Sequence, residues 1–287
     1  SATITFDLTL YPDFRTDPWV NQATGTGTGA VTGVSHSDDS TDGTDPDGGD
    51  NDTQPDEDVI TDVNVPVVGI AKQASPLAIV SDDVFTLSIT LTMANYGSEV
   101  LTNLQVTDDL TTKFGTYVAL LADVDSAGEF TVANLASPTL TVNPAFNGEG
   151  DQNLLTGTDT LAPETTATIT FDLTFQPSFL RSPFTNQATV TGTGAVSGAV
   201  VTDDSTDGTD PDGGDSDELP DEDDLTIIEV PGIGTAKNGG LPVDNGNATY
   251  SVPITITLEN FGTETLNGVQ VTDDLTTEFG TFEALLA

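Results

Sequence analysis

The sequence predicts an all-β protein built from tandem immunoglobulin-like antiparallel β-sandwiches that are joined by acidic linkers. Three observations lead to this prediction: the chain repeats itself at an offset of 165 in the residue numbering, its apolar residues alternate with polar ones, and its acidic residues gather in two segments. Alternation with a period of two is typical of half-buried strands. A small barrel is the alternative fold.

The repeat extends over most of the chain. The string ATITFDLT at residues 2–9 recurs unchanged at residues 167–174, and residues 1–122 align with residues 166–287 without a gap. In this alignment 68 of the 122 residue pairs are identical. Self-similarity at a fixed offset indicates a tandem array. Because both ends fall within a repeat, we expect the 287 residues to be part of a longer chain.

The strands follow from the alternation. The two clearest apolar faces consist of Phe85, Leu87, Ile89, Leu91 and Met93, and of Ile169, Phe171, Leu173 and Phe175. Further strands are expected at residues 65–72, 100–107, 129–133, 139–142, 184–192 and 195–202. About seven antiparallel strands in about 140 residues, with no amphipathic helical pattern, favour an immunoglobulin-like sandwich over a helical or mixed fold.

The acidic segments divide the chain into five regions. Residues 61–202 form one complete sandwich, residues 38–60 and 203–224 are acidic linkers, residues 1–37 end a preceding repeat, and residues 225–287 begin a following one. The two partial repeats leave apolar faces without a partner sheet, such as the one formed by Ile4, Phe6, Leu8 and Leu10. We therefore expect contacts with neighbouring repeats or with copies of the same chain, through complementation of the missing strands.

The charge excludes several classes of partner. There are 47 acidic residues against 5 basic ones, and the formal net charge is -42. Such a polyanion repels phosphate backbones and anionic lipid headgroups, so nucleic-acid binding is not expected. The apolar runs are much shorter than the ~20 residues that cross a bilayer, so no membrane insertion is expected in this segment. Without cysteine there is no disulfide or thiolate metal site.

The acidic segments are candidates for calcium binding. Residues 38–62 and 203–224 hold 23 of the 47 acidic residues and none of the basic ones. Closely spaced aspartates with glycines for sharp turns provide the oxygen ligands that calcium takes. The order of residues does not fit an EF-hand, and a disordered acidic linker is the alternative. The candidate ligands are Asp38, Asp39, Asp42, Asp45, Asp47, Asp50, Asp52, Asp56, Asp58, Asp203, Asp204, Asp207, Asp210, Asp212, Asp215, Asp217, Asp221 and Asp223.

An ordered set of motifs resembles a known family. The motifs are VPVVGIAK at 65–72, NYG at 95–97, LQVTDDL at 104–110, TLTVNPAFNG at 139–148, NLLTGTDTLAP at 153–163, NQATVTG at 186–192 and DSTDGTDPD at 204–212. Together they are similar to the DUF11-type repeats of large bacterial surface and secreted proteins. The resemblance implies an extracellular β-sandwich module with a structural or adhesive role, and it implies no catalytic residues.

Two further candidate sites carry less weight. His36 is the sole histidine and its counterpart is Val201, so a catalytic triad or a transition-metal site is not expected. Lys72 and Asn186 recur as Lys237 and Asn21, and an intramolecular bond between such a pair requires a buried acid beside it. Asp7 and Asp172, the acids considered, lie on the polar faces of their strands. We therefore expect ordinary exposed lysines.

These observations favour a structural function. The first hypothesis is a non-catalytic repeat of an extracellular or cell-surface fibre or stalk, in which calcium stiffens the acidic linkers. The second is an adhesin-type module that binds a glycan or a protein through its loops and has flexible linkers. An enzyme is disfavoured because there is no cysteine, one unrepeated histidine and no glycine-rich phosphate loop.

Overall fold

A computed structural model describes residues 1–10, 18–49, 54, 57–81, 84–115, 129–179, 182–214 and 220–276. The chain divides into two compact units, Ser1–Ile228 and Glu229–Ala287. Strands dominate both units, and the described residues contain one short helix, α1 (Thr111–Phe114). The all-β prediction is confirmed.

The first unit contains a sheet of six strands. Its strands, in spatial order, are β15 (Thr206–Asp207), β5 (Val68–Ala74), β7 (Val84–Asn95), β11 (Thr166–Phe175) and β9 (Phe130–Ala136), and β6 (Ala78–Ser81) also pairs with β7. The longest ladder joins β7 and β11 over ten residue pairs, from Thr166 opposite Ala94 to Phe175 opposite Phe85. All these pairings are antiparallel except that of β15 with β5, which is parallel.

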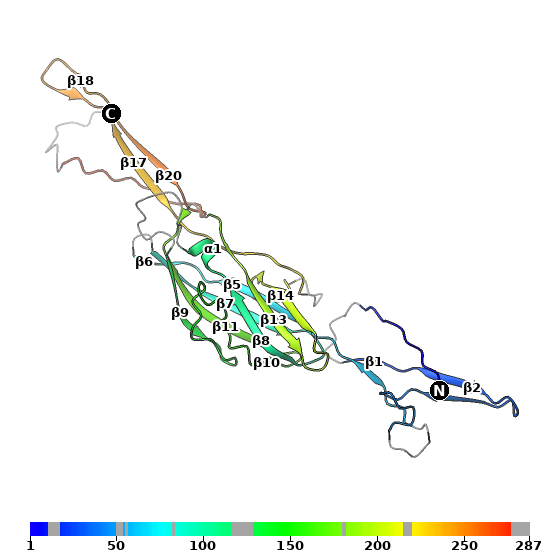
Figure 1. Ribbon diagram of the computed structural model, residues 1–287. Helices are drawn as coiled ribbons and strands as arrows, with labels where there is room; N and C mark the ends of the chain where they lie inside the picture. Colours follow the sequence, from blue (N-terminus) through cyan, green and yellow to red (C-terminus); the bar gives the residue numbers. More distant parts are fainter. Residues whose placement is uncertain are drawn as a thin grey trace. The chain divides into compact units, whose positions relative to one another are not determined.

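A second sheet of four strands packs against the first. Its order is β10 (Asp159–Leu161), β8 (Leu101–Asp108), β13 (Ala188–Gly194) and β14 (Val200–Asp204). Strand β5 of the first sheet contacts both β13 and β14. Figure 1 shows the two sheets lying over one another, as in a sandwich.

The core between the sheets follows the predicted alternation. Leu87, Ile89, Leu91 and Met93 on β7 are buried, and the residues between them are half-buried or exposed. The apolar face of β11 is buried in the same way. The strand predicted at 139–142 is reduced to an isolated bridge between Val142 and Leu155, and Thr141 donates its backbone and side-chain hydrogens to the Asp159 carboxylate.

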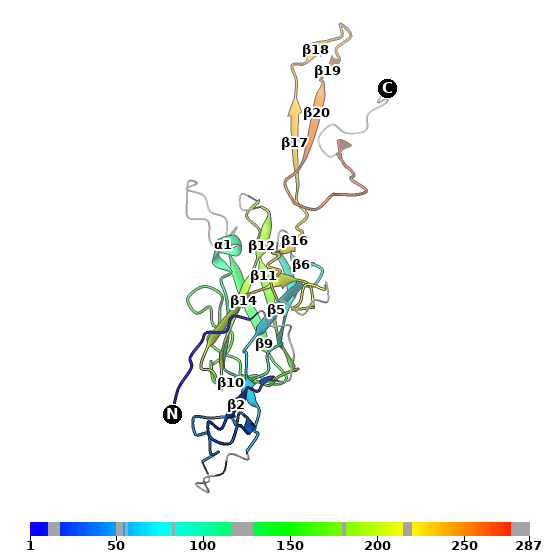
Figure 2. The same ribbon diagram turned by 90° about the vertical axis from the view of Figure 1, so that its right-hand side faces the viewer.

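The strand predicted at 184–192 is divided at Gln187. Before it, β12 (Phe184–Asn186) pairs with β16 (Thr226–Ile228), and after it β13 pairs with β8. Figure 2 shows β12 and β16 near α1, and α1 contacts β12. The chain thus changes partners at this point, and β12 pairs with the first strand of the following repeat.

The strand predicted at 195–202 begins later, because a turn occupies residues 195–198. The buried carboxylate of Glu99 holds this turn by accepting hydrogen bonds from the backbone N–H groups of Val196 and Ser197 and from the Ser197 hydroxyl. Although burial acts to raise its pKa, these hydrogen bonds favour the ionised form and keep the pKa of Glu99 below its usual value. The turn leads directly into β14.

The partial repeats reproduce several strand pairings of the complete one. Near the N-terminus, β1 (Trp19–Asn21) pairs with β4 (Thr61–Val63), and β2 (Thr24–Thr28) pairs with β3 (Ser35–Asp39). In the second unit, β17 (Ile233–Gly239) pairs with β20 (Ile254–Asn260), and β18 (Val243–Asp244) with β19 (Tyr250–Ser251). At the offset of the sequence repeat, the β1–β4 register equals that of β12–β16, and the β17–β20 register equals that of β5–β7.

None of the helices described is long and apolar enough to cross a lipid bilayer.

Candidate functional site: a buried lysine, aspartate and asparagine

The most unusual buried polar group of the sandwich is Lys72. It lies on β5 and has no exposed surface, so the prediction of an ordinary exposed lysine is wrong for this residue. The reason is that β5 is an inner strand of its sheet, covered by β13 and β14 of the other sheet and contacted by β16. Lys72 lies on the same face of β5 as the buried residues Val68 and Ile70.

Asp108, at the end of β8, is the ionic partner of Lys72. Its side chain is fully buried, and its Oδ2 atom accepts a hydrogen bond from Lys72 Nζ. Asp172, the acid considered from the sequence, has its carboxylate on the other face of the sheet, where it accepts hydrogen bonds from Ser88 and Asn134. Asp108 could have been recognised in the sequence, because it follows Leu104 and Val106 at every second position and so lies on the same buried face of β8.

Asn186 completes the group. The register of β13 on β8 places Ala188 opposite Asp108, and Asn186 lies two residues earlier on the same face. Its side-chain Nδ2 donates to Asp108 Oδ1 at 2.9 Å and to the carbonyl oxygen of Asp109 at 3.2 Å. Its Oδ1 atom accepts a hydrogen bond from Lys72 Nζ. Each of the three side chains therefore contacts the other two.

Thr226 positions two members of this group. It is buried on β16 directly opposite Asn186, and its hydroxyl donates to the carbonyl oxygen of Lys72 at 2.9 Å. The residue thus fixes the distance between β5 and β12. The three rings of Phe114, Phe175 and Phe184 pack together at the same end of the sandwich, and Phe184 is two residues before Asn186.

Burial brings Lys72 closer to its neutral amine form than a lysine in water. Loss of hydration by burial lowers its pKa, while the adjacent Asp108 carboxylate acts in the opposite direction. Burial of both groups also strengthens their mutual interaction, since water does not screen it. The site therefore combines a potential amine nucleophile, a carboxyl group able to accept and return protons, and a carboxamide.

The described parts of the two acidic segments share the same turns. In each loop the sequence Asp-Pro-Asp-Gly forms a turn, in which Gly48 N–H donates to Asp45 O and Gly213 N–H donates to Asp210 O, both at 3.1 Å. The next glycines, Gly49 and Gly214, have φ values of 85° and 83°, which favour glycine. The expectation that glycines provide sharp turns is confirmed.

In both acidic segments, one glutamine side chain bonds to the beginning and to the end of the segment. Gln187 Nε2 donates to the carbonyl oxygens of Ser205 and Asp223, at 3.3 and 3.0 Å. Its counterpart Gln22 makes the same two bonds to Ser40 and Asp58. The described ends of each acidic segment therefore lie close together, on either side of one glutamine side chain.

The structure places the candidate ligands as follows. Asp38 and Asp39 are on β3, Asp203 and Asp204 on β14 and Asp207 on β15; Asp42, Asp45, Asp47, Asp58, Asp210, Asp212, Asp221 and Asp223 are in the loops; Asp50, Asp52, Asp56, Asp215 and Asp217 lie outside the described residues. Among the described residues, no group of three or more histidine, aspartate or glutamate side chains is arranged to hold a metal. Calcium binding stays a prediction.

The strongest electrostatic effect in the loops falls on Asp203. Burial raises the pKa of Asp203 to about 8, although the hydrogen bond that its carboxylate accepts from Ile70 N–H at 2.7 Å acts to lower the pKa. The neighbouring carboxylates of Asp223, Asp204 and Glu222 raise it further. Burial and the charges of Asp204 and Asp221 also raise the pKa of Asp223. The two ends of the second loop thus hold carboxylates that repel one another.

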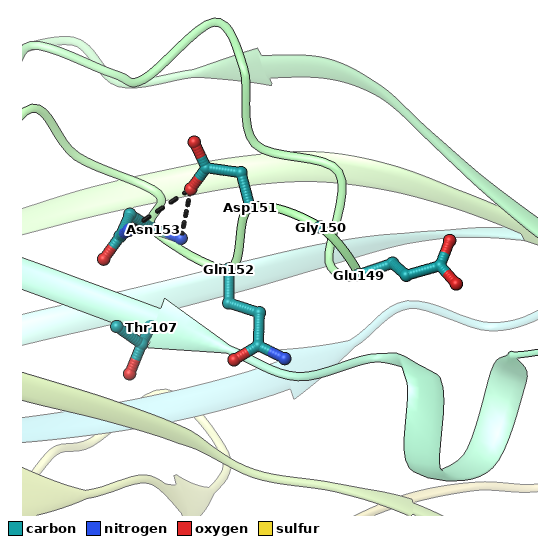
Figure 3. Close-up of a pocket in the computed structure, with 6 residues that line it drawn as sticks. All are labelled: Thr107, Glu149, Gly150, Asp151, Gln152 and Asn153. Atoms are coloured by element: carbon teal, nitrogen blue, oxygen red, sulfur yellow. Dashed lines mark hydrogen bonds between the residues drawn. The ribbon is translucent and has the colours of Figure 1, made fainter.

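A shallow polar pocket lies on the loops beside β8. Its lining residues are Thr107, Glu149, Gly150, Asp151, Gln152 and Asn153. Figure 3 shows the Asp151 carboxylate turned towards Asn153, with Glu149 pointing away from both. Hydrogen bonds from Asn143 and Asn153 keep the pKa of Asp151 below its usual value, so this carboxylate stabilises its own loop.

No family model and no curated protein matches the chain, so the resemblance to DUF11-type repeats stays a prediction. Among solved structures, the chain is similar to the crystal structure of BcpA*(D312A), the major pilin subunit of Bacillus cereus. The identity is 11% and the TM-score 0.27, and the match covers 70% of this chain and about 60% of the pilin.

Proposed function

We propose that the chain is part of an extracellular or cell-surface fibre or stalk, in which it serves as a non-catalytic structural repeat. The observation that carries this proposal is that the same joint is built twice. At each joint a short strand ladder, β1–β4 or β12–β16, lies beside an acidic loop whose ends are bonded to one glutamine. A chain that repeats both its sandwich and its joint extends by adding units end to end.

We propose that calcium binds in the acidic loops and stiffens the joints. Support comes from the high density of carboxylates, from the equal turns of the two loops and from the repulsion around Asp203, Asp204 and Asp223. A divalent cation would reduce this repulsion and draw together the beginning and the end of the loop. Calcium sites of extracellular modules bind at about 0.1 to 1 mM, so binding would depend on a calcium-rich exterior.

Equilibrium dialysis and small-angle scattering of the whole chain test the calcium proposal. We expect calcium uptake and a longer, stiffer particle, both reversed by a chelator. In the variant Asp45→Asn/Asp210→Asn, uptake should fall, whereas in the control Glu149→Gln/Glu259→Gln, which removes the same charge from exposed positions outside the loops, it should not. Absence of uptake by the unaltered chain at millimolar calcium would exclude this part of the proposal.

We further propose that copies of the chain associate through their partial repeats. Ile4, Phe6 and Leu8 are 89%, 78% and 67% exposed, although the same residues are buried in the complete repeat. Among the described strands, β20 pairs only with β17, whereas its counterpart β7 also pairs with β11. The segment 1–10 of one copy therefore matches the open side of β20 in another copy.

Sedimentation velocity over a range of concentrations tests this association. We expect oligomers that are lost in the variant Phe6→Lys and kept in the control Val31→Lys, because Val31 is in an exposed turn. An unaltered chain that stays monomeric at all concentrations, or equal behaviour of the two variants, would contradict strand complementation.

The pocket of Figure 3 favours a second candidate function, an adhesin-type module that recognises a glycan or a protein through its loops. Its six lining residues present mainly polar groups on one side of the sandwich. Binding to a panel of glycans that is lost in Gln152→Ala and kept in the control Gln105→Ala would support it. Gln105 is a suitable control because its side chain bonds to Leu155 outside the pocket lining.

A further inference from the structure

We propose that Lys72 and Asn186 become joined by an isopeptide bond that the folded chain forms by itself, with Asp108 as the proton carrier. The three side chains are buried, each contacts the other two, and they come from three different strands. The modification needs no external substrate, because both reacting groups belong to the same sandwich.

A plain buried ion pair does not account for this arrangement. Removing a lysine and an aspartate from water has a cost that their attraction repays only with good geometry and further hydrogen bonds. Here the third group is a carboxamide with its oxygen on the amine and its nitrogen on the carboxylate. The carboxamide carbon, bonded to both atoms, therefore lies beside the amine that could attack it.

The chemistry balances without an added reagent. The neutral amine of Lys72 attacks Cγ of Asn186, a C–N bond forms, and the carbonyl electron pair moves onto oxygen. The carbonyl then re-forms, the bond from Cγ to Nδ2 breaks, and Nδ2 leaves as ammonia with the proton that Nζ has lost. One amine and one carboxamide give one secondary amide and one ammonia, and nothing is oxidised or reduced.

The two oxygens of Asp108 are placed for this proton transfer. Oδ2 accepts the hydrogen bond of Lys72 Nζ, and Oδ1 accepts that of Asn186 Nδ2 at 2.9 Å. A proton taken from the attacking amine at one oxygen can thus be delivered to the departing nitrogen from the same carboxyl group. Burial supports the neutral form of the amine, which is the nucleophile.

The second unit contains the counterparts of two of these three residues, the lysine and the aspartate. Lys237 Nζ donates to both oxygens of Asp273, at 2.8 and 2.6 Å, and the two side chains are 43% and 32% exposed. The lysine and the acid therefore recur together at the offset of the sequence repeat. The contacts described for Lys237 are with Asp273, without an asparagine, which makes this pair an internal control for the first.

The bond would change how the repeat bears tension, a consequence that rests on the proposed function. It links β5, at the start of the repeat, to β12, near its end. The segment between Lys72 and Asn186 would be excluded from the path of the force. Without the bond this segment could extend by about 370 Å. The sandwich would thus keep its length even when its hydrogen bonds open.

The mass of the whole chain under denaturing conditions tests the proposal. We expect a mass lower than that of the sequence by one ammonia. Because succinimide formation at an Asn-Gly sequence also releases ammonia, the linked peptide must be identified as well. After trypsin digestion, residues 16–113 should stay uncut at Lys72 and should carry residues 182–237 attached.

Variants assign the roles. Lys72→Met, Asn186→Ala and Asp108→Asn should each lack the linked peptide and show the full mass, and far-ultraviolet circular dichroism shows whether each variant folds. The controls Lys237→Met and Asn21→Ala should keep the linked peptide. A folded, unaltered chain with full mass and normal cleavage after Lys72 would overturn the proposal. A linked Asp108→Asn variant would overturn the role of Asp108.

The measurement is made on single chains without calcium, so its outcome is independent of assembly. A linked chain that forms no fibre would contradict the proposed function and leave the isopeptide bond intact. An unlinked chain that associates and binds calcium would do the opposite.

Discussion

Residues 2–9 and 167–174 have the same sequence and different structures. In the complete repeat this string is part of β11, and Ile169, Phe171 and Leu173 are at most 1% exposed. Near the N-terminus the same string forms no strand, and Phe6, the counterpart of Phe171, is 78% exposed. The difference arises because β11 lies between β7 and β9, which have no counterpart beside residues 1–10. Strand propensity alone is insufficient, since a strand becomes stable by pairing and by covering its apolar face.

The lysines show the same effect. Lys72 is completely buried because both sheets and β16 surround it, whereas the Lys237 side chain is 43% exposed in the partial repeat. Repeated sequence therefore becomes a repeated site only where the whole sandwich is present.

The largest difference between the copies is expected for the asparagines. Asn186→Ala removes the proposed bond, and a covalent closure of about 100 residues contributes about 4–5 kcal/mol on the chain-entropy scale used for disulfides. Asn21→Ala, at the exposed counterpart, should change the free energy of unfolding by less than about 0.5 kcal/mol. Denaturant unfolding followed by circular dichroism measures both, and equal effects would contradict the comparison.

A slightly smaller difference is expected in the cores of the copies. Phe171→Ala should lower the free energy of unfolding of the sandwich by about 3–5 kcal/mol, because it leaves a cavity between the sheets. Phe6→Ala in the same sequence context should have almost no effect on a dilute monomer. Unfolding midpoints in denaturant provide the test, and a destabilising Phe6→Ala would show that residues 1–10 are covered in solution.

The substitutions Glu99→Ala and Glu264→Ala, at equivalent positions of the repeat, should differ in their effect on stability. The folded-state pKa of Glu99 is lowered, so its contribution to stability is present above the unfolded-state pKa and is lost as the pH falls through the folded-state pKa. At pH 7, Glu99→Ala should destabilise the sandwich by about 1.5–3 kcal/mol, since hydrogen bonds to a charged group are lost. The exposed Glu264 lacks these bonds, and Glu264→Ala is the matched control in thermal unfolding at several pH values.

The smallest effect is expected at Asp203. Because burial raises its folded-state pKa to about 8, the stability associated with the protonated form is lost as the pH rises from the unfolded-state pKa through about 8. Asp203→Asn keeps an acceptor for Ile70 N–H and should stabilise the chain at pH 8 by about 1 kcal/mol, a figure reduced for solvent screening. At pH 4 the variant and the unaltered chain should be similar. If calcium binds there, adding it should remove the advantage of the variant.

Much of the fold could be predicted because it depends on local patterns. The alternation on β7 and β11 and the glycine turns are properties of short segments, and the structure confirms them. Residues 139–142 form an isolated bridge instead of a full strand, and the backbone N–H of Thr141 donates to the Asp159 side chain, which is 18 residues away in sequence. The division of a predicted strand at Gln187 arises from a change of partner strand, which no local pattern records.

The candidate site shows the same limit. Lys72 and Asn186 were recognised as matching positions, and Asp108 carried a signal in the buried alternation of Leu104 and Val106. Their meeting could not be predicted, because it depends on the register that places Ala188 opposite Asp108 and on the contact of β16 with β5.

The amino-acid sequence was enough to identify an all-β tandem array, in which residues 1–122 align with residues 166–287, and to locate about half of the acidic residues in two segments. Periodicity and composition are properties of the chain, so they can be read without coordinates. The folded chain was needed to see that the two ends of the second acidic segment meet at Gln187 and that Lys72, Asp108 and Asn186 meet in the interior of the sandwich. Burial and proximity between distant residues depend on which strands pair and which faces pack, and these are properties of the complete fold.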